Sequence, residues 1–557
     1  MTSSFKRGAD LLARTLRRAG VKQIFTLSGN HIMPIFDAAH EVGIALIHAR
    51  HEAAAVHMAD AWARLSGEPG IAMVTGGPGH ANAVGALYTA AMAESPVVLL
   101  SGHAPISQLG KGAFQEMRQA EIAAPLSKAS WTAESTEGLT ADVARALRTA
   151  AAGRPGPVHL SLPSDLLEAD GGAGAPSAAA AGRGEFEPQP QRLAPAHAAE
   201  VCARLRRARR PLVLTGPVTL TPRGRGRLAA LEASLGVPVV GMESPRGIGD
   251  PALGAFAEML AQADCVLLLG KPLDFTLKFG SSPAFEADCE FLQIDPDAAE
   301  IDRARRAVGG RLTVALQADS LAAIDALCDA KAGGEKAGGE KSGGGDTSRG
   351  WCDEVRAAIA HRPAAWDSAT GRNGRLHPVQ ALRPLQALLD RDADAVLVSD
   401  GGEIGQWAQA CLSAPNRVIN GVAGSIGAAL PFALGARVAK PASTIVTVLG
   451  DGTFGFHCAE IDTAVRYGLP FVTVVGNDAR WNAEYQIQVR DYGVDRAVGC
   501  ELLPTRYDAV CAAFGGHGER VTEEAALLSA AERALASGLP ACLNVMIEGL
   551  PAPNIRR

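Results

Sequence analysis

Short apolar runs rich in β-branched residues recur along the whole chain, and stretches of helical periodicity separate them. Clear examples are residues 71–77, 97–102, 211–216, 265–270, 396–400, 444–451 and 471–478. Such runs are typical of strands that helices bury on both faces. The alternation predicts an α/β fold built from doubly wound parallel sheets. In such folds ligands bind at the carboxyl ends of the strands, where loops lead into the next helices.

At 557 residues the chain is too long for a single core. Two stretches rich in small residues, 168–191 and 330–350, have the composition of flexible linkers. They predict three α/β domains over residues 1–167, 192–329 and 351–557.

Composition excludes several classes of function. A net charge of −6 without a dominant basic run argues against a nucleic-acid partner. The ten cysteines lack metal-site or disulfide spacing, which favours reduced thiols and a cytoplasmic location. With no run of 18 apolar residues and no apolar signal core near Met1, we expect no membrane partner.

The strongest motif lies in the last domain. Asp451 follows one predicted strand, and Asp478 follows the next strand 27 residues later. Glycines beside Asp451 allow a diphosphate to approach the backbone at a helix start, which favours anions. Two oxygen ligands at adjacent strand ends can hold a hard cation in an octahedral oxygen shell that phosphate oxygens complete. The predicted cation–diphosphate site comprises Gly450, Asp451, Gly452, Thr453 and Asp478.

This pattern resembles the metal–diphosphate motif of enzymes that depend on thiamine diphosphate (ThDP), and the resemblance extends over nearly the whole chain. It is closest to the group of acetolactate synthases, benzaldehyde lyases and 2-hydroxyacyl-CoA lyases. The resemblance implies pyrimidine-binding, central Rossmann-like and diphosphate-binding domains, in that order. It implies ThDP and Mg²⁺ as cofactors, with Asp451, Asp478 and the backbone oxygen of Arg480 as metal ligands. The sequence has Asp478 where the family usually has Asn.

The resemblance also assigns residues to the pyrimidine half of the cofactor. Glu52 opens a predicted helix after a strand, and in the family this glutamate exchanges a proton with the aminopyrimidine ring. That exchange leads to removal of the thiazolium proton. Residues 75–82 resemble a cofactor-facing loop, in which Thr75, Pro78 and Asn82 are the expected contacts.

Two further loops of the last domain are expected to contact the cofactor. Ile426 matches a bulky apolar residue that holds the cofactor bent, and the carbonyl of Gly424 would accept a hydrogen bond from its amino group. The glycine spacing over 421–427 is GxxGxxG, which differs from the GxGxxG dinucleotide fingerprint. Gly401 and Gly402 end an earlier strand and are expected to line the diphosphate site.

Substrate contacts are predicted in three segments. In the family, the counterparts of Asn30 and His31 point at the reacting carbonyl, and a histidine can relay a proton near neutral pH. Phe114 and Gln115 belong to an FQE motif like that of acetolactate synthases and acyl-CoA lyases. Trp481 is expected at the substrate entrance.

The sequence does not decide which ligand the middle domain binds. Residues 273–280 resemble the acyl-CoA lyases more than the flavin-binding segment of biosynthetic acetolactate synthases. FAD, an ADP or CoA moiety, and no nucleotide all remain alternatives. Arg246 and Lys271 are the cations expected nearest to a nucleotide.

Three functions follow. The first is an acetolactate-synthase-like carboligase or decarboxylase acting on a 2-keto acid. The second is a 2-hydroxyacyl-CoA lyase or a benzaldehyde-lyase-type hydroxyketone lyase, acting on acyl-CoA or hydroxyketone substrates to release an aldehyde. The third is a non-catalytic regulatory homologue, which the retained Glu52, Asp451 and Asp478 argue against. Because the family forms its site between two chains, a homodimer is the minimum assembly and a homotetramer is common.

Overall fold

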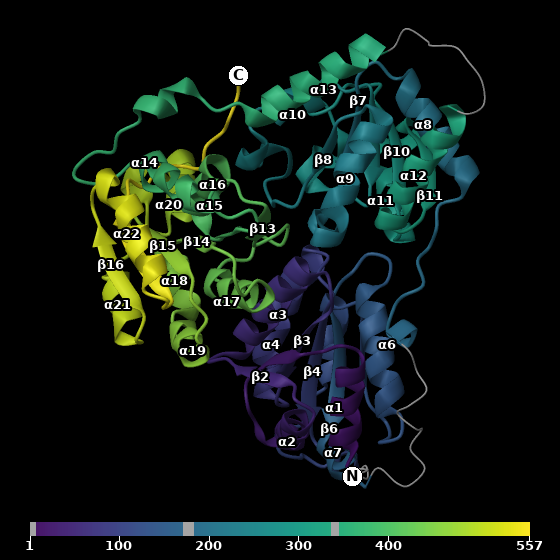
Figure 1. Cartoon of the computed structure of the whole chain (residues 1–557), viewed down its shortest axis with the longest axis vertical. Coiled ribbons are helices and arrows are strands. Elements are labelled where there is room, and N and C mark those ends of the chain that lie inside the picture. The colour runs from purple at the N-terminus through teal and green to yellow at the C-terminus, as the bar shows by residue number, and fades with distance from the viewer. Residues whose placement is uncertain (1–6, 171–182, 336–344) are drawn as a thin grey trace.

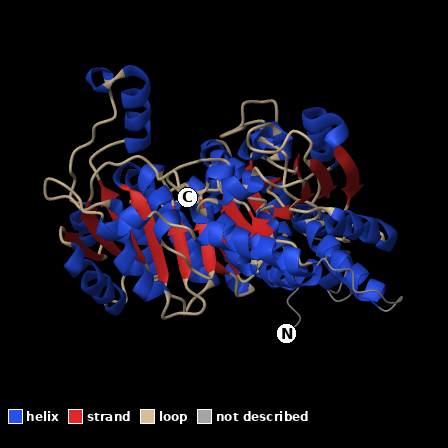
Figure 2. Ribbon diagram, turned by 90° about the horizontal axis from the view of Figure 1, so that it is seen from above, coloured by secondary structure: helices blue, strands red, loops and turns tan. Residues whose placement is uncertain are grey.

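The computed structural model describes residues 7–170, 183–335 and 345–557 of the chain. Three sheets, each with parallel strands throughout, follow one another along the sequence. Figure 1 shows the first at the bottom, the second at the upper right and the third at the left. Figure 2 shows helices enclosing the strands on both faces. The predicted fold class is confirmed.

The first sheet has the strand order β2-β1-β3-β4-β6-β5. Its strands are β1 (Gln23–Thr26), β2 (Ala45–His48), β3 (Gly70–Val74), β4 (Val97–His103), β5 (Ala129–Thr132) and β6 (Val158–Pro163). The helices are α1 (Gly8–Arg18), α2 (Met33–Glu41), α3 (Glu52–Ser66), α4 (Pro78–Met92), α5 (Gln119–Ala123), α6 (Leu139–Ala151) and α7 (Ser164–Glu168).

The middle sheet has the order β11-β10-β9-β7-β8. Its strands are β7 (Pro211–Thr215), β8 (Val239–Gly241), β9 (Cys265–Leu269), β10 (Glu290–Asp295) and β11 (Leu312–Gln317). The helices are α8 (Pro195–Arg207), α9 (Pro222–Leu235), α10 (Phe256–Leu260), α11 (Ala298–Val308), α12 (Ser320–Glu335) and α13 (Gly345–Ala360). Trp351 and Val355 of α13 lie in the same apolar core as Phe256 of α10.

The third sheet has the order β13-β12-β14-β15-β17-β16. Its strands are β12 (Val396–Ser399), β13 (Asn416–Ile419), β14 (Ile445–Gly450), β15 (Val472–Asn477), β16 (His517–Val521) and β17 (Ala541–Met546). The helices are α14 (Pro378–Leu382), α15 (Gln386–Leu389), α16 (Gly402–Cys411), α17 (Ala429–Ala439), α18 (Asp451–His457), α19 (Glu460–Tyr467), α20 (Asn482–Tyr492), α21 (Tyr507–Ala513) and α22 (Glu524–Ala536).

Parts of both predicted linkers, 171–182 and 336–344, lie outside the described residues. On either side of the second gap, residues 330–335 belong to α12 and residues 345–350 to α13, so helix extends further than the composition predicts. No helix of the described residues is long and apolar enough to cross a membrane. All ten cysteines lie among the described residues, and each is a free thiol.

Helices α3 and α17 join the first and third domains through one continuous apolar core (Figure 1). The helices approach closely because position 435 is glycine: a Cβ there would lie 2.3 Å from the carbonyl oxygen of Met58. Small residues such as Ala54 and Ala433 fill the interface and are fully buried. Interiors this dense resist deformation, so the two domains are held in one relative position within the chain.

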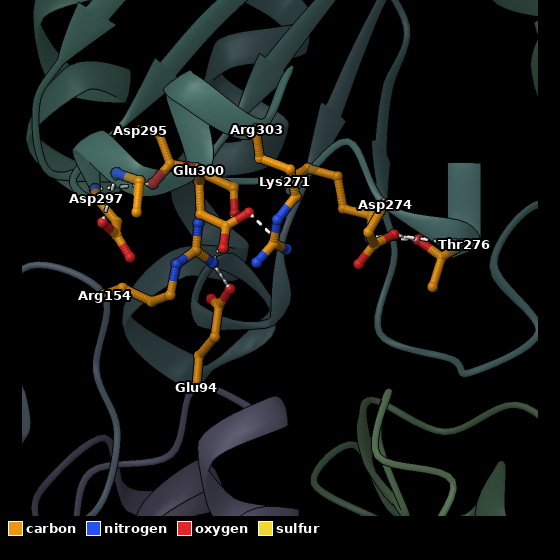
Figure 3. Close-up of polar contacts among 11 residues, drawn as sticks. Glu94, Arg154, Lys271, Asp274, Thr276, Asp295, Asp297, Glu300 and Arg303 are labelled. Atoms are coloured by element: carbon orange, nitrogen blue, oxygen red, sulfur yellow. Dashed lines mark hydrogen bonds and ion pairs between the residues drawn. The ribbon is translucent and has the colours of Figure 1, made fainter. Parts of the chain in front are cut away.

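A buried ionic network joins the first domain to the middle domain (Figure 3). The guanidinium of Arg154 contacts the Glu94 carboxylate and donates to Asp295 Oδ2 at 2.6 Å and to the carbonyl of Gly270 at 3.2 Å. Glu94 Oε2 also accepts a hydrogen bond from the backbone N–H of Val218 at 3.1 Å. Burial raises the pKa of both Glu94 and Asp295, and the charge of Arg154 opposes that rise. Arg154 thus compensates two carboxylates that are otherwise costly to bury.

Replacing Arg154 with alanine is expected to destabilise the folded protein by about 3–5 kcal/mol, because two buried carboxylates lose their counter-charge. Chemical denaturation followed by circular dichroism measures this loss. Arg204→Ala is the matched control, since Arg204 also pairs with two carboxylates but its pairs are partly exposed, and it should cost about 1 kcal/mol or less. Equal losses for the two variants would contradict the role assigned to Arg154.

Candidate cofactor site

A cavity opens at the carboxyl ends of β12, β14 and β15 in the third domain. Every third-domain residue that the sequence predicts for the cofactor, the metal or the substrate entrance lines it. These are Gly401, Gly402, Gly424, Ile426, Gly450, Asp451, Gly452, Thr453, Asp478, Arg480 and Trp481. The structure therefore brings four separate loops of the sequence together around one hollow.

Glycine is required where these loops touch. Gly401 has a φ of +78°, and a Cβ there would lie 2.6 Å from the Cγ2 of Thr453. At position 452 a Cβ would lie 2.6 Å from the indole ring of Trp481. Trp481 thus packs directly on the loop that carries Asp451. Gly401 supplies the left-handed backbone conformation, and both glycines allow the close approach.

Asp451 and Asp478 are both buried and lie close enough to influence each other's ionisation. Burial raises the pKa of both carboxyl groups, and the charge of Asp451 raises the pKa of Asp478 further. Among the described residues, Asp451 Oδ2 has no hydrogen-bond partner. A divalent cation removes both problems, since it neutralises the pair and takes up the free oxygen. The residues present therefore fit Mg²⁺.

These two carboxylates do not form a complete metal site by themselves. Nowhere in the described chain do three His, Cys, Asp or Glu side chains converge on one point. A cation held by Asp451 and Asp478 needs further oxygen ligands, which a diphosphate can supply. This agrees with a metal that binds together with a phosphorylated cofactor.

The side chains of Asp400 and His457 bond the backbone just after the loop of Gly424 and Ile426. Asp400 Oδ2 accepts hydrogen bonds from the N–H groups of Gly427 at 2.8 Å and Ala429 at 3.0 Å. Burial raises the pKa of Asp400 to about 6. His457 Nδ1 lies 2.8 Å from the carbonyl oxygen of Gly427. Sequence reasoning assigned neither residue this role, because both act through backbone atoms about 30 residues away along the chain.

The pyrimidine-side residues gather on the first domain. Glu52 is the first residue of α3 and is buried, and Asn82 Nδ2 of α4 donates to Glu52 Oε2 at 3.0 Å. Gly79 lies between Glu52 and Thr75: a Cβ there would be 3.4 Å from Glu52 Oε1 and 2.8 Å from Thr75 Cγ2. Pro78 is the first residue of α4. The structure thus assembles Glu52, Thr75, Pro78 and Asn82 at the N-termini of two adjacent helices.

The predicted substrate residues continue this surface. His31 Nδ1 lies 3.1 Å from Thr75 Oγ1, and the imidazole faces the Phe114 ring at a centroid distance of 6.1 Å. Burial lowers the pKa of His31, so its neutral form is favoured at pH 7. Gln115 has a φ of +57° and lies against Gly77, while Asn30 begins the short helical turn that carries His31. Phe114 is 68% exposed.

Gln119 supports this surface and was not predicted. Its Oε1 accepts from the N–H of Gly77 at 2.8 Å, and its Nε2 donates to the Gly102 carbonyl and to Ser161 Oγ, both at 3.0 Å. The side chain fixes the turn between Thr75 and Pro78. A single glutamine in a helix has no sequence signature for this role.

The predicted first-domain residues do not line the third-domain cavity. Every residue that lines the third-domain cavity belongs to the middle or the third domain, whereas Glu52, Asn82, Thr75 and His31 all belong to the first. The predicted site residues of the chain therefore fall into two separate groups.

Such a chain, with three parallel α/β domains, a glycine-lined cavity that holds two buried carboxylates, and a separate buried glutamate, has the construction of a ThDP-dependent enzyme. Sequence comparison identifies the particular family. The thiamine pyrophosphate enzyme N-terminal TPP-binding domain matches residues 6–122, the central domain residues 198–327 and the C-terminal TPP-binding domain residues 400–545. The chain belongs to the thiamine pyrophosphate enzyme family.

Relatives that match nearly the whole chain support the same family assignment. A probable acetolactate synthase of Mycobacterium bovis is 33% identical over 97% of this chain and 95% of its own length. The 2-hydroxyacyl-CoA lyase 2 of Danio rerio is 31% identical over 97% of this chain and 92% of its own, and that of Homo sapiens is 30% identical over 98% and 90%. The predicted membership in this group of ThDP-dependent enzymes is confirmed.

Proposed function

We propose that this enzyme makes or breaks a carbon–carbon bond next to a carbonyl, as an acetolactate-synthase-like carboligase or decarboxylase of a 2-keto acid. The observation that carries the proposal is the buried pair of Asp451 and Asp478, with a free carboxylate oxygen facing glycine-lined loops. The relative that is named a probable acetolactate synthase supports the choice of reaction.

When bound, ThDP supplies a thiazolium carbon that adds to a carbonyl and stores the electron pair of the cleaved bond. Asp451, Asp478 and the backbone oxygen of Arg480 would hold Mg²⁺ and with it the diphosphate. Gly401, Gly402, Gly450, Gly452 and Thr453 would surround the diphosphate, while Gly424 and Ile426 would contact the pyrimidine. Glu52 would exchange a proton with the pyrimidine ring, with Asn82 orienting its carboxylate.

On the substrate side, the neutral imidazole of His31 can hydrogen-bond an oxygen that gains negative charge, and Gln115 can hold a substrate oxygen. Thr75 Oγ1 fixes the His31 ring. Phe114 and Trp481 would exclude water from either end of the site.

A hydroxyketone or 2-hydroxyacyl-CoA lyase is the second candidate. The buried His31 favours it, since a lyase needs a group that accepts a proton from the substrate hydroxyl. The relatives named 2-hydroxyacyl-CoA lyase 2 also favour it.

A product assay decides between these reactions. The enzyme with ThDP and Mg²⁺ is incubated with pyruvate, and separately with 2-hydroxyacyl-CoA esters and hydroxyketones. Acetolactate and carbon dioxide from pyruvate establish the carboligase. Aldehyde release without turnover of pyruvate establishes the lyase and rejects the first proposal.

We further propose that the enzyme is at least a homodimer, with Glu52 of one chain facing Asp451 of the other, and that a tetramer is a pair of such dimers. Mixed dimers test this. Chains carrying Glu52→Gln and chains carrying Asp451→Asn are each expected to be nearly inactive. Co-expressed with different affinity tags, they should form heterodimers with one intact site and about half of the wild-type activity. Heterodimers as inactive as either parent would place both residues of a site on one chain.

For the middle domain we propose that no tightly bound FAD, ADP or CoA moiety lies beside Lys271 and Arg246, the two cations expected nearest to a nucleotide. Lys271 is buried and donates to Thr276 Oγ1 at 2.7 Å, with Asp274 at 3.8 Å (Figure 3). Arg154 already binds Glu94 and Asp295, and Arg246 reaches Glu403 beside the third-domain cavity at 3.2 Å. These cations are engaged within the protein, so they offer little to a diphosphate.

Purified enzyme is accordingly expected to lack flavin absorbance near 450 nm. Millimolar ADP or CoA should leave its unfolding temperature unchanged, whereas ThDP with Mg²⁺ should raise it. A yellow protein, or one stabilised by ADP alone, would contradict this assignment.

The domain boundaries and the location also remain proposals. The sequence predicts units over residues 1–167, 192–329 and 351–557. Because α13, which ends at Ala360, packs on the middle domain, we propose that the last unit begins near residue 361 instead. We propose a cytoplasmic enzyme, in keeping with its free thiols.

A further inference from the structure

The turn that leads into Glu52 is held by a helix of the third domain. This turn, residues 48–51, connects β2 to α3. The hydroxyl of Tyr467 in α19 accepts from the N–H of His48 at 2.9 Å, and Arg466 Nη2 donates to the His48 carbonyl at 2.7 Å. Figure 1 shows α19 beside β2. The last residues before Glu52 therefore depend on a partner more than 400 residues away along the chain.

Glu460, the first residue of α19, makes the contacts nearest to Glu52. Its Oε1 accepts from the N–H groups of Arg50 at 2.9 Å and His51 at 3.1 Å, and its Oε2 accepts from Thr463 Oγ1 at 2.7 Å. The side chain is 1% exposed, and burial raises its pKa. Without this carboxylate, two partly buried N–H groups would lose their acceptor, which favours a rearranged turn.

The same helices reach the diphosphate half-site. Helix α18 begins at Asp451 and ends at His457, whose ring bonds the loop of Gly424 and Ile426, and α19 follows after only two residues. The His457 ring also lies edge-on to the His51 ring at 5.7 Å. One short segment thus connects the metal carboxylate to the turn that carries Glu52.

We propose that Glu460 is a positioning residue that fixes the carboxylate of Glu52 for proton exchange with the cofactor. The inference rests on the proposed function, because it takes Glu52 as the acid–base group. Where a site is shared between two chains, Glu460 also ties the Glu52 of one site to the metal-binding helix of the neighbouring site. Glu460 acts on the position of Glu52, because it contacts the backbone just before that residue and is not proposed to contact the cofactor.

The test compares Glu460→Ala with Glu460→Gln in the full-length enzyme. Exchange of the thiazolium proton of bound ThDP is followed by acid quench and NMR, and affinity for inorganic diphosphate with Mg²⁺ is measured by calorimetry. Glu460→Ala is expected to slow exchange about 10²-fold, the effect of misplacing a reacting group by about 1 Å, without weakening diphosphate binding. Glu460→Gln should restore most of the rate, because its amide oxygen can accept both N–H groups.

Glu532→Gln is the control in the third domain. Glu532 of α22 pairs with Arg391 at 2.8 Å, both side chains are exposed and neither contacts the turn before Glu52, so exchange should remain as in the wild type. If Glu460→Ala does not fold, Thr463→Val replaces it, since loss of that hydroxyl loosens Glu460 and should slow exchange severalfold. Wild-type exchange in Glu460→Ala or its substitute, or equal loss in Glu460→Gln, overturns the proposal.

Failure of the proposed function would give a different set of results from failure of the positioning role. If wild-type enzyme does not bind ThDP, or if Glu52→Gln exchanges as fast as the wild type, the acid–base role of Glu52 is wrong whatever Glu460 does. If both behave as expected and Glu460→Ala exchanges normally, only the positioning role fails.

Discussion

Replacing Glu52 with glutamine is expected to slow exchange of the thiazolium proton by about 10²–10⁴-fold, the range that general acid–base catalysis contributes. Glutamine fills the same space and can still accept from Asn82, but its amide cannot exchange a proton with the pyrimidine ring. ThDP and Mg²⁺ should bind with nearly unchanged affinity, since the residues proposed to hold the metal and the diphosphate all belong to the third domain. Product formation should fall in parallel with exchange.

The control for this variant is Glu68→Gln, which removes an exposed glutamate near the end of α3 that pairs with Arg223. It is expected to exchange and turn over as the wild type does. Unchanged exchange in Glu52→Gln would reject the acid–base role. Lost ThDP binding would show instead that Glu52 serves mainly to hold the cofactor.

Asp451→Asn is expected to weaken Mg²⁺ binding in the presence of ThDP by at least about 10²-fold. Two opposite unit charges at 4 Å interact by about 4 kcal/mol at an effective dielectric constant of 20, which corresponds to roughly three orders of magnitude in affinity. Asp478→Asn should weaken binding less, because the family usually has Asn at this position and uses its amide oxygen as the ligand. Calorimetric titration with Mg²⁺ measures both, and equal affinity in all three proteins would exclude Asp451 as a ligand.

Without Mg²⁺, the same two carboxylates should make the stability of the folded protein depend on pH. Burial raises the pKa of Asp451 and Asp478 in the folded protein above the ordinary value of 3.8, and the charge of Asp451 raises that of Asp478 further. The folded state then binds more protons than the unfolded state, so metal-free stability falls as pH rises above about 4 through the folded pKa values. Mg²⁺ competes with these protons, and its stabilising effect should therefore grow with pH.

Thermal unfolding at several pH values, with and without Mg²⁺, checks this dependence. Asp478→Asn removes one of the two repelling charges and should unfold at a higher temperature than the wild type in metal-free buffer near pH 8. A wild-type protein whose metal-free stability rises over the same pH range would contradict the assignment.

Much of the third-domain half-site was predictable because its signals are local. A glycine and a carboxylate at the end of a β-branched strand specify the chemistry of that loop, and adjacent parallel strands bring such ends together. Asp451, Asp478 and Gly401 therefore line one cavity as their strand-end positions predict. Glu52 and Asn82 followed from the family resemblance, since a glutamate at a helix start carries little information alone.

The sequence by itself determined the three α/β domains, because strand periodicity depends only on neighbouring residues, and its strand-end motifs with the family resemblance identified the ThDP family. Only the tertiary structure decided how those parts are joined. Glu460, Arg154 and Asp400 act through backbone groups or counter-charges far away in the chain, and their identity follows no period. The helical residues flanking the gap at 336–344 differ from the predicted linker for a related reason: packing of Trp351 and its neighbours on the middle domain outweighs a glycine-rich composition.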